Sequence, residues 1–193
     1  TPIARWADRG AVVQGTDENY EDEFLSAHTL MSGSGYEHYE VSNFANHGMM
    51  SRHNSAYWTG ESYLGVGPSA HSFDGATRRW NVAAYSEWVR RLAAGESVIG
   101  GEESLTAENR AAEEVYLGLR TRQGLKIADE ERARVRTWEG AGWALVDESL
   151  GNSRVRLTPT GWLRLDSLAA DLASQRSRPL SATVGPNPSH CYI

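Results

Sequence analysis

The residue types best suited to ligand chemistry lie in the 22-residue stretch Ser51–Ser72, which holds two histidines, three large aromatic residues and three glycines. Its first part contains His53, Asn54, Tyr57 and Trp58. A neutral imidazole is a good axial ligand for heme iron. Aromatic rings can stack on or wall a flat macrocycle, and a neighbouring amide can fix the imidazole tautomer. In the structural alternative, the histidine and amide hydrogen-bond a tight loop and the aromatic residues belong to the core.

The remainder of this stretch has the pattern of a strand that leads into a ligand loop. His53–Trp58 is too polar for a core strand and lacks a helical apolar stripe, which predicts a loop. Tyr63–Gly67 is typical of a short buried strand. An α/β protein usually keeps its ligand where a strand ends in a loop of small residues, so this stretch is predicted to line a site.

The loop after that strand supplies four more candidate binding residues, which are Gly67, Ser69, Ala70 and His71. Glycine permits a backbone or a ligand to approach closely. The amides and hydroxyls of such a loop can bind a carboxylate. The His71 side chain can be a polar residue that lines the site or one that holds the loop together, and the sequence leaves both interpretations open.

The elements expected to position these residues alternate between helix and strand. Thr16 has the chemistry of a helix cap, and the apolar residues after it recur at helical spacing until Gly33. Tyr36–Phe44 is expected to be a strand, and a helix–turn–strand order predicts a mostly parallel sheet that also contains Tyr63–Val66. Both faces of Tyr36–Phe44 mix polar and apolar residues. One face therefore borders a barrel lumen or cleft, or the strand lies at a sheet edge.

A second helix and a change of rhythm predict two domains. The helix is expected over Val82–Ala94, with Val82, Tyr85, Val89 and Leu92 facing inward. The glycine-containing connector at 95–101 is the expected boundary. The predicted domains are therefore 1–100, 101–173, and a disordered tail over 174–193 in which His190 and Cys191 are incidental.

The second predicted domain has a winged-helix-like order of helix, helix, hairpin and helix. That fold often binds DNA, but Arg132, Arg134 and Arg136 alternate along a helix and so do not form one basic stripe. The acidic residues Glu130, Glu131 and Glu139 flank them and dilute their charge. The net charge of −6 gives no electrostatic case for a nucleic-acid partner, so none is expected.

The bulk composition is that of an ordinary water-soluble protein in a reducing compartment. Hydrophobic residues make up 40% and charged residues 23% of 193 residues. No apolar run approaches the roughly 20 residues that span a membrane, and no signal peptide opens the chain. Cys191 is the only cysteine, which excludes an intrachain disulfide and cannot by itself hold an iron–sulfur cluster. A cytoplasmic location is expected.

Two segments together resemble the HemW/HemN family of radical S-adenosylmethionine proteins. They are Gly35–Ala45, GYEHYEVSNFA, and His53–Trp58, which matches the HNxxYW signature of the HemW branch and is the most specific feature. The resemblance extends from about residue 1 to about residue 173, and Asn109–Glu114 and Leu117–Arg120 match the start of the family's C-terminal domain. It implies an α/β fold: the C-terminal part of a partial TIM-like radical SAM barrel, followed by a small helical, winged-helix-like domain.

The resemblance also implies a function and its alternative. HemW-type proteins bind heme and deliver it to target proteins, so heme and heme-accepting proteins are the implied partners and His53 a possible ligand of the heme iron. The alternative is an oxygen-independent coproporphyrinogen III oxidase, in which the loop corresponding to Gly67–Ser72 borders the S-adenosylmethionine site. The CxxxCxxC motif that holds the family's [4Fe–4S] cluster has no counterpart here. This segment alone is therefore not expected to be catalytic.

Overall fold

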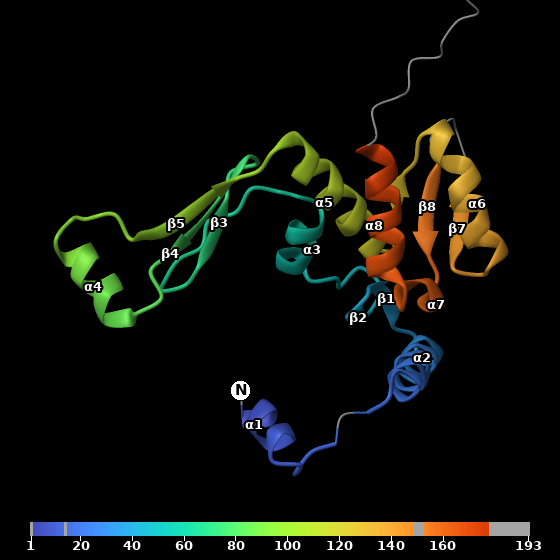
Figure 1. Ribbon diagram of the computed structural model, residues 1–193, viewed down its shortest axis with the longest axis horizontal. Helices are drawn as coiled ribbons and strands as arrows, with labels where there is room; N and C mark the ends of the chain where they lie inside the picture. The colour runs from blue at the N-terminus through green and yellow to red at the C-terminus, as the bar shows by residue number, and fades with distance from the viewer. Residues whose placement is uncertain (1, 14, 149–152, 178–193) are drawn as a thin grey trace, which may run out of the picture.

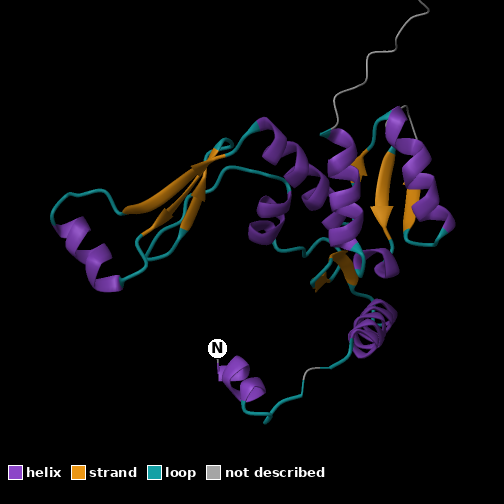
Figure 2. Cartoon of the chain, in the orientation of Figure 1, coloured by secondary structure: helices purple, strands orange, loops and turns teal. Residues whose placement is uncertain are grey.

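The computed structural model describes residues 2–13, 15–148 and 153–177 (Figures 1 and 2). Eight α-helices and a short 3₁₀ helix, η1, are assigned in these ranges. The helices are α1 (Pro2–Asp8), α2 (Asp17–Gly33), α3 (Arg52–Trp58), α4 (Tyr85–Ala93), α5 (Ala107–Arg120), η1 (Asp129–Glu131), α6 (Arg132–Gly140), α7 (Pro159–Trp162) and α8 (Leu165–Arg176). The strands are β1 (Glu37–Glu40), β2 (Asn43–Ala45), β3 (His71–Phe73), β4 (Thr77–Asn81), β5 (Ile99–Ser104), β6 (Leu125–Lys126), β7 (Ala144–Asp147) and β8 (Arg154–Leu157).

Helix α2 begins where the sequence predicted, because the Thr16 hydroxyl accepts a hydrogen bond from the Asn19 amide at 3.2 Å. Fewer of its apolar residues are buried than their helical spacing predicts. Phe24 packs against the core, but the side chains of Tyr20 and Leu30 remain 62% and 71% exposed. The helix is therefore attached along only part of its length.

The expected strand Tyr36–Phe44 is instead an antiparallel hairpin of β1 and β2. The buried Glu40 carboxylate causes the break: its Oε1 accepts hydrogen bonds from the Ser42 amide and the Asn43 side chain. The backbone beside it bonds to the segment after α5, through Val41 N to Arg120 O and Arg122 N to Tyr39 O. The prediction of one long strand was wrong, because polar side chains turn the backbone.

The expected parallel sheet was wrong as well. Every strand pair among the described residues is antiparallel, and the three sheets have the orders β1-β2, β3-β4-β5 and β6-β8-β7. Tyr63–Val66 is not a buried strand: only Tyr63 makes a bridge, to Phe73, and the Leu64 and Val66 side chains are more than 80% exposed. Tyr36–Phe44 and Tyr63–Val66 thus do not share a sheet.

The β3-β4-β5 sheet and α4 form an arm that extends away from the rest of the molecule (Figure 1). Helix α4 is shorter than predicted, and its apolar residues Tyr85, Val89 and Leu92 are 41–70% exposed, so their predicted inward orientation was wrong. Part of the expected connector at 95–101 is strand β5, because residues from Ile99 onward pair with β4.

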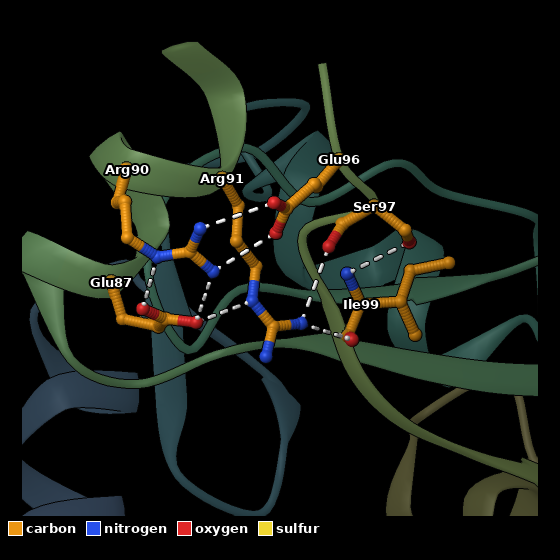
Figure 3. A network of polar contacts seen from close by, with 6 residues as sticks. All are labelled: Glu87, Arg90, Arg91, Glu96, Ser97 and Ile99. Atoms are coloured by element: carbon orange, nitrogen blue, oxygen red, sulfur yellow. Dashed lines mark hydrogen bonds and ion pairs between the residues drawn. The ribbon is translucent and has the colours of Figure 1, made fainter. Parts of the chain in front are cut away.

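Ion pairs hold the C-terminal end of α4 to the chain that follows it (Figure 3). Arg90 contacts the carboxylates of Glu87 and Glu96 at 2.8–3.1 Å, and Arg91 bonds to Glu87 and to the carbonyl oxygens of Ser97 and Ile99. Hydrogen bonds from Arg90 and Arg91 lower the pKa of Glu87 to about 2. Charged contacts therefore shape this end of the arm.

The predicted order of helix, helix, hairpin and helix is observed after residue 106, with the two-residue strand β6 inserted between α5 and α6. One apolar cluster fills this domain, and Val115, Leu119, Val155 and Leu172 at its centre are completely buried. The Thr158 hydroxyl caps α7 and Pro159 follows it at the start of the helix, as expected for a threonine followed by proline. Helix α8 extends through residues 174–176 of the expected tail, while 178–193, with His190 and Cys191, lie outside the described residues.

Candidate functional site

The residues His53–Trp58 form a helix, α3, and not the predicted loop. The Ser51 hydroxyl caps α3 by accepting a hydrogen bond from the Asn54 amide at 3.3 Å. Residues four positions apart lie on one helix face, so His53 and Tyr57 are neighbours, with ring centroids 5.0 Å apart. The Ser51 cap was the sequence signal that could have revealed this helix.

A tyrosine, and not the expected amide, contacts the His53 imidazole. The Tyr57 hydroxyl lies 3.1 Å from His53 Nε2, whereas the hydrogen bond described for Asn54 uses its backbone amide. Among the described residues, no partner is assigned to His53 Nδ1. The exposed His53 side chain thus offers one nitrogen in contact with a phenol and one that is open to a ligand.

Trp58 fastens α3 to the C-terminal domain. The Arg120 guanidinium lies 4.3 Å from the centre of the Trp58 ring, a cation–π contact. Arg120 also donates to Glu40 Oε2 at 2.9 Å and to the Ser42 hydroxyl at 3.1 Å. The Trp58 Nε1 atom is buried with no hydrogen-bond partner among the described residues. Sequence reasoning missed Arg120 and Glu40, because their contact joins positions 80 residues apart.

A cleft of about 1030 Å³ lies between α3, the arm and α5. Tyr57 and Trp58 line it together with aromatic residues of the arm. Tyr63 lies 4.7 Å from Tyr57 between ring centroids, so aromatic contacts are continuous from His53 across Tyr57 to Tyr63. The lining residues used below are Tyr57, Trp58, Tyr63, His71, Phe73, Trp80, Leu117, Lys126 and Arg154. His53 itself lies one helical turn before Tyr57, outside this lining.

The predicted loop Gly67–His71 is tied together by its own backbone. Ser69 N donates to Val82 O at 3.1 Å and Ala70 N donates to Gly67 O at 3.3 Å, so neither amide is free for a ligand. Ser69 has a φ of 58°, a left-handed conformation that is uncommon outside glycine. The exposed His71 side chain lines the cleft, with its ring 6.0 Å from that of Trp80.

The predicted close backbone approach occurs at Gly65. A Cβ atom at this position would lie 2.1 Å from the carbonyl oxygen of His71, which no side chain allows. The Gly65 amide donates to the Ser72 hydroxyl at 3.0 Å. Glycine is therefore needed at this position because two chain segments pack closely there, and not because a ligand approaches.

The other histidines near the site have protein partners. His38 is 6% exposed, stacks on Phe44 at 3.9 Å, and its Nε2 lies 3.1 Å from Val41 O. Its Nδ1 lies 3.0 Å from Nδ1 of His28, and burial lowers the pKa of both imidazoles. His47 contacts the Glu37 carboxylate at 2.8 Å. Of His28, His38, His47 and His53, only His53 has no carboxylate or second imidazole beside it.

The donor set does not fit an iron–sulfur cluster. Such clusters need several thiolates, and the sequence has one cysteine. Among the described residues no group of three or more His, Cys, Asp or Glu side chains is placed to hold a metal ion. In the same part of the chain, none of the helices has both the length and the apolar character needed to cross a membrane.

Comparisons with known proteins agree on one family. No family model matches the sequence. The chain is 35% identical over 165 residues to the heme chaperone HemW of Mycobacterium tuberculosis. The matched residues make up 86% of this chain and 42% of the relative. It is 38% identical over 95 residues to HemW of Bacillus subtilis, covering 49% of this chain and 25% of the relative. The chain thus spans less than half the length of these curated relatives.

The fold resembles a solved structure of coproporphyrinogen III oxidase (HemN) from Escherichia coli, described as a radical SAM enzyme. The TM-score is 0.54 at 15% identity, and the match covers 78% of this chain and 40% of the other. This likeness confirms the predicted α/β fold class, although the strands expected at Tyr36–Phe44 and Tyr63–Val66 were wrong.

Proposed function

The chain belongs to the HemW/HemN family, and we propose on that premise that it forms part of a heme chaperone, which binds heme beside α3 and delivers it to other proteins. One observation carries the proposal: within the HNxxYW segment, the exposed His53 imidazole lies at the end of an aromatic series that lines a large cleft. An accessible imidazole and flat aromatic walls are the groups that a heme requires.

His53 is the proposed ligand of the heme iron. Its Nδ1 has no partner among the described residues, whereas its Nε2 contacts the Tyr57 hydroxyl at 3.1 Å. Ligation through Nε2 requires this hydroxyl to turn away. Tyr57→Phe removes the competing contact, so it strengthens hemin binding if Nε2 is the ligand and leaves it unchanged if Nδ1 is.

The proposed macrocycle walls are Tyr57, Tyr63 and Phe73, while Trp58 holds α3 in place and Asn54 contributes through its backbone.

The experiment is a hemin titration of the parent chain, His53→Ala and a matched control, His47→Ala. His47 is an exposed histidine that contacts only Glu37 among the described residues. The parent and the control are expected to give a histidine-type Soret spectrum that His53→Ala loses. Circular dichroism is expected to be unchanged, because the exposed His53 carries little of the core. Equal affinity and spectrum for all three proteins would refute the ligand role.

The second candidate function is oxidative decarboxylation of coproporphyrinogen III, and the observation that favours it is the shared fold with HemN. Radical chemistry requires the cluster and S-adenosylmethionine, and the single cysteine of this chain is too few thiolates to hold the cluster. Porphyrin production from coproporphyrinogen III by a protein of the relatives' full length, with no hemin uptake by this chain, would favour the oxidase.

The loop of Gly67, Ser69, Ala70 and His71 stays a proposed binding element on the S-adenosylmethionine side. Its amides at 69 and 70 are used internally, so the Ser69 hydroxyl and the His71 imidazole are the groups proposed to meet a ligand. The proposed partners are heme and heme-accepting proteins, with no nucleic acid. A cytoplasmic location is proposed from the single cysteine.

A further inference from the structure

Two cations lie opposite each other on the neighbouring strands β6 and β8, at the end of the cleft that these strands form. Lys126 on β6 and Arg154 on β8 are direct register partners in an antiparallel pair, and both line the cleft. Like charges directly opposite each other destabilise a sheet. A fold that retains such a pair gains when an anion lies between the two side chains.

The protein itself supplies no carboxylate to this pair among the described residues. Arg154 donates to the carbonyl oxygen of Gly124 at 3.0 Å, and the Lys126 ammonium has no assigned partner. Four carboxylates line the cleft, and no contact between any of them and the pair is described. Glu113 forms a bidentate ion pair with Arg78 at 2.7 and 2.9 Å, Glu114 lies 3.9 Å from Arg176, and Glu61 accepts a hydrogen bond from Thr59. Both cations therefore line the cleft without a described ion pair to a carboxylate.

The backbone around the pair is fixed. Gly124 has a φ of 73°, and a Cβ atom there would lie 2.3 Å from Val155 O, so the turn before β6 is closely packed on β8. This packing places the Gly124 carbonyl oxygen where it accepts a hydrogen bond from Arg154. The Arg154 head group is thereby oriented before any ligand arrives, which reduces the entropy cost of binding.

We infer that Lys126 and Arg154 bind a carboxylate side chain of the tetrapyrrole. The inference rests on the proposed heme-binding function and assigns an orientation to it: the macrocycle lies along the aromatic wall, with a carboxylate at the β6–β8 end. Arginine recognises a carboxylate through paired donors, and a lysine adds a point charge. Tetrapyrroles with free carboxylates are the ligand class, and their esters are excluded.

The chain allows an unusually direct test, because Lys126 is its only lysine. An amine-acylating reagent can modify only this side chain and the N-terminal amine, which peptide mass spectrometry separates. Hemin is expected to slow acylation of Lys126, and hemin dimethyl ester is expected not to. Iron-free protoporphyrin should also protect Lys126, because the contact involves the carboxylate and not the iron.

Charge reversal provides the second measurement. Lys126→Glu and Arg154→Glu are each expected to weaken hemin binding by about tenfold, the size of one lost charge-assisted hydrogen bond. Binding of the dimethyl ester should not weaken. The matched control is Arg136→Glu, an exposed arginine on α6 whose side chain is 69% accessible. Circular dichroism of each variant identifies any loss of fold.

The outcomes separate this inference from the proposed function. Suppose that hemin gives a histidine-type spectrum, does not slow acylation of Lys126, and binds Lys126→Glu and Arg154→Glu as tightly as the parent. The carboxylate site is then refuted and the heme function stands. If hemin gives no such spectrum while protoporphyrin protects Lys126, the iron ligand is wrong and the carboxylate site stands. Protection by inorganic phosphate equal to that by hemin would also refute the inference, because the pair would then bind any anion.

Discussion

The two halves of the molecule differ in how many apolar side chains they bury. Every member of the central apolar cluster lies between residues 115 and 172, whereas Tyr39 is the only buried apolar residue described before Leu105. Conversely, all but one of the large apolar side chains that are exposed among the described residues precede residue 100; the exception is Leu145. The C-terminal half is stabilised by apolar burial, which the first half largely lacks.

This difference shows that an apolar stripe predicts a face but not the partner that covers it. The stripe of α5 meets α8 and the β6-β8-β7 sheet, whereas Tyr85, Val89 and Leu92 in the stripe of α4 stay 41–70% exposed. The candidate heme site lies on the weakly buried half, against the well-packed half. Its geometry depends on the few polar contacts that join the two.

The largest effect is expected from Leu172→Ala in the C-terminal core. Leu172 is completely buried, so the variant loses transfer free energy and leaves a cavity, which costs about 2–5 kcal/mol. The matched control is Leu92→Ala on α4, where the side chain is 50% exposed and the expected change is within about 0.5 kcal/mol. Urea unfolding followed by circular dichroism measures both. Equal losses would break the contrast between the halves.

A smaller effect is expected at the junction of the two halves. Glu40 is completely buried and accepts hydrogen bonds from Arg120, Ser42 and Asn43. Glu40→Ala leaves the Arg120 guanidinium without its carboxylate and costs about 2 kcal/mol. It should also release the Trp58 contact and loosen α3, which faster proteolysis after Arg52 reports. If Glu40→Ala matches the parent in both its stability and its rate of proteolysis, then the polar contacts of Glu40 do not hold the two halves together.

The contact between His28 and His38 predicts an acid-sensitive attachment of α2. Burial lowers the pKa of His38 and His28 below the ordinary value of 6.5, so the unfolded chain binds protons that the folded one does not. The stability from the neutral pair is present above pH 6.5 and is lost as the pH falls through the folded pKa values. His38→Phe should flatten the unfolding profile between pH 7 and 5. A parent profile without slope contradicts the prediction.

The smallest effect is expected from the α4 ion pairs shown in Figure 3. Arg90 and Glu87 lie at the surface, and exposed ion pairs contribute little because water and salt screen them. Arg90→Ala is expected to leave the midpoint of thermal unfolding unchanged within error, both in low salt and in 0.5 M sodium chloride. A clear drop that high salt removes would show that these pairs hold the arm.

Local chemistry made several elements predictable from the sequence. Thr16, Thr106 and Thr158 cap helices through their hydroxyls, and the hairpin strands around 144–157 have β-branched and apolar alternation. The hairpin turn at 151–152 lies outside the described residues. The fold class came from the family motifs, and the later match to HemN agrees with it.

The failures share a physical cause, which is contact between residues far apart in the sequence. Glu40 breaks the expected strand because Arg120 meets it from 80 positions away. The Tyr57 hydroxyl reaches His53 only because the Ser51 cap makes the segment helical. Lys126 and Arg154 become a pair only through strand register. Sequence motifs identified the residues of the candidate site but not their partners.

Rescue of ligation by free imidazole tests the central claim most directly. His53→Gly removes the proposed iron ligand and leaves the aromatic cleft in place. Hemin added to this variant should give no histidine-type spectrum, and added imidazole should restore the parent spectrum. If His53→Gly gives the parent spectrum without imidazole, then His53 does not ligate heme and the account of the site is wrong.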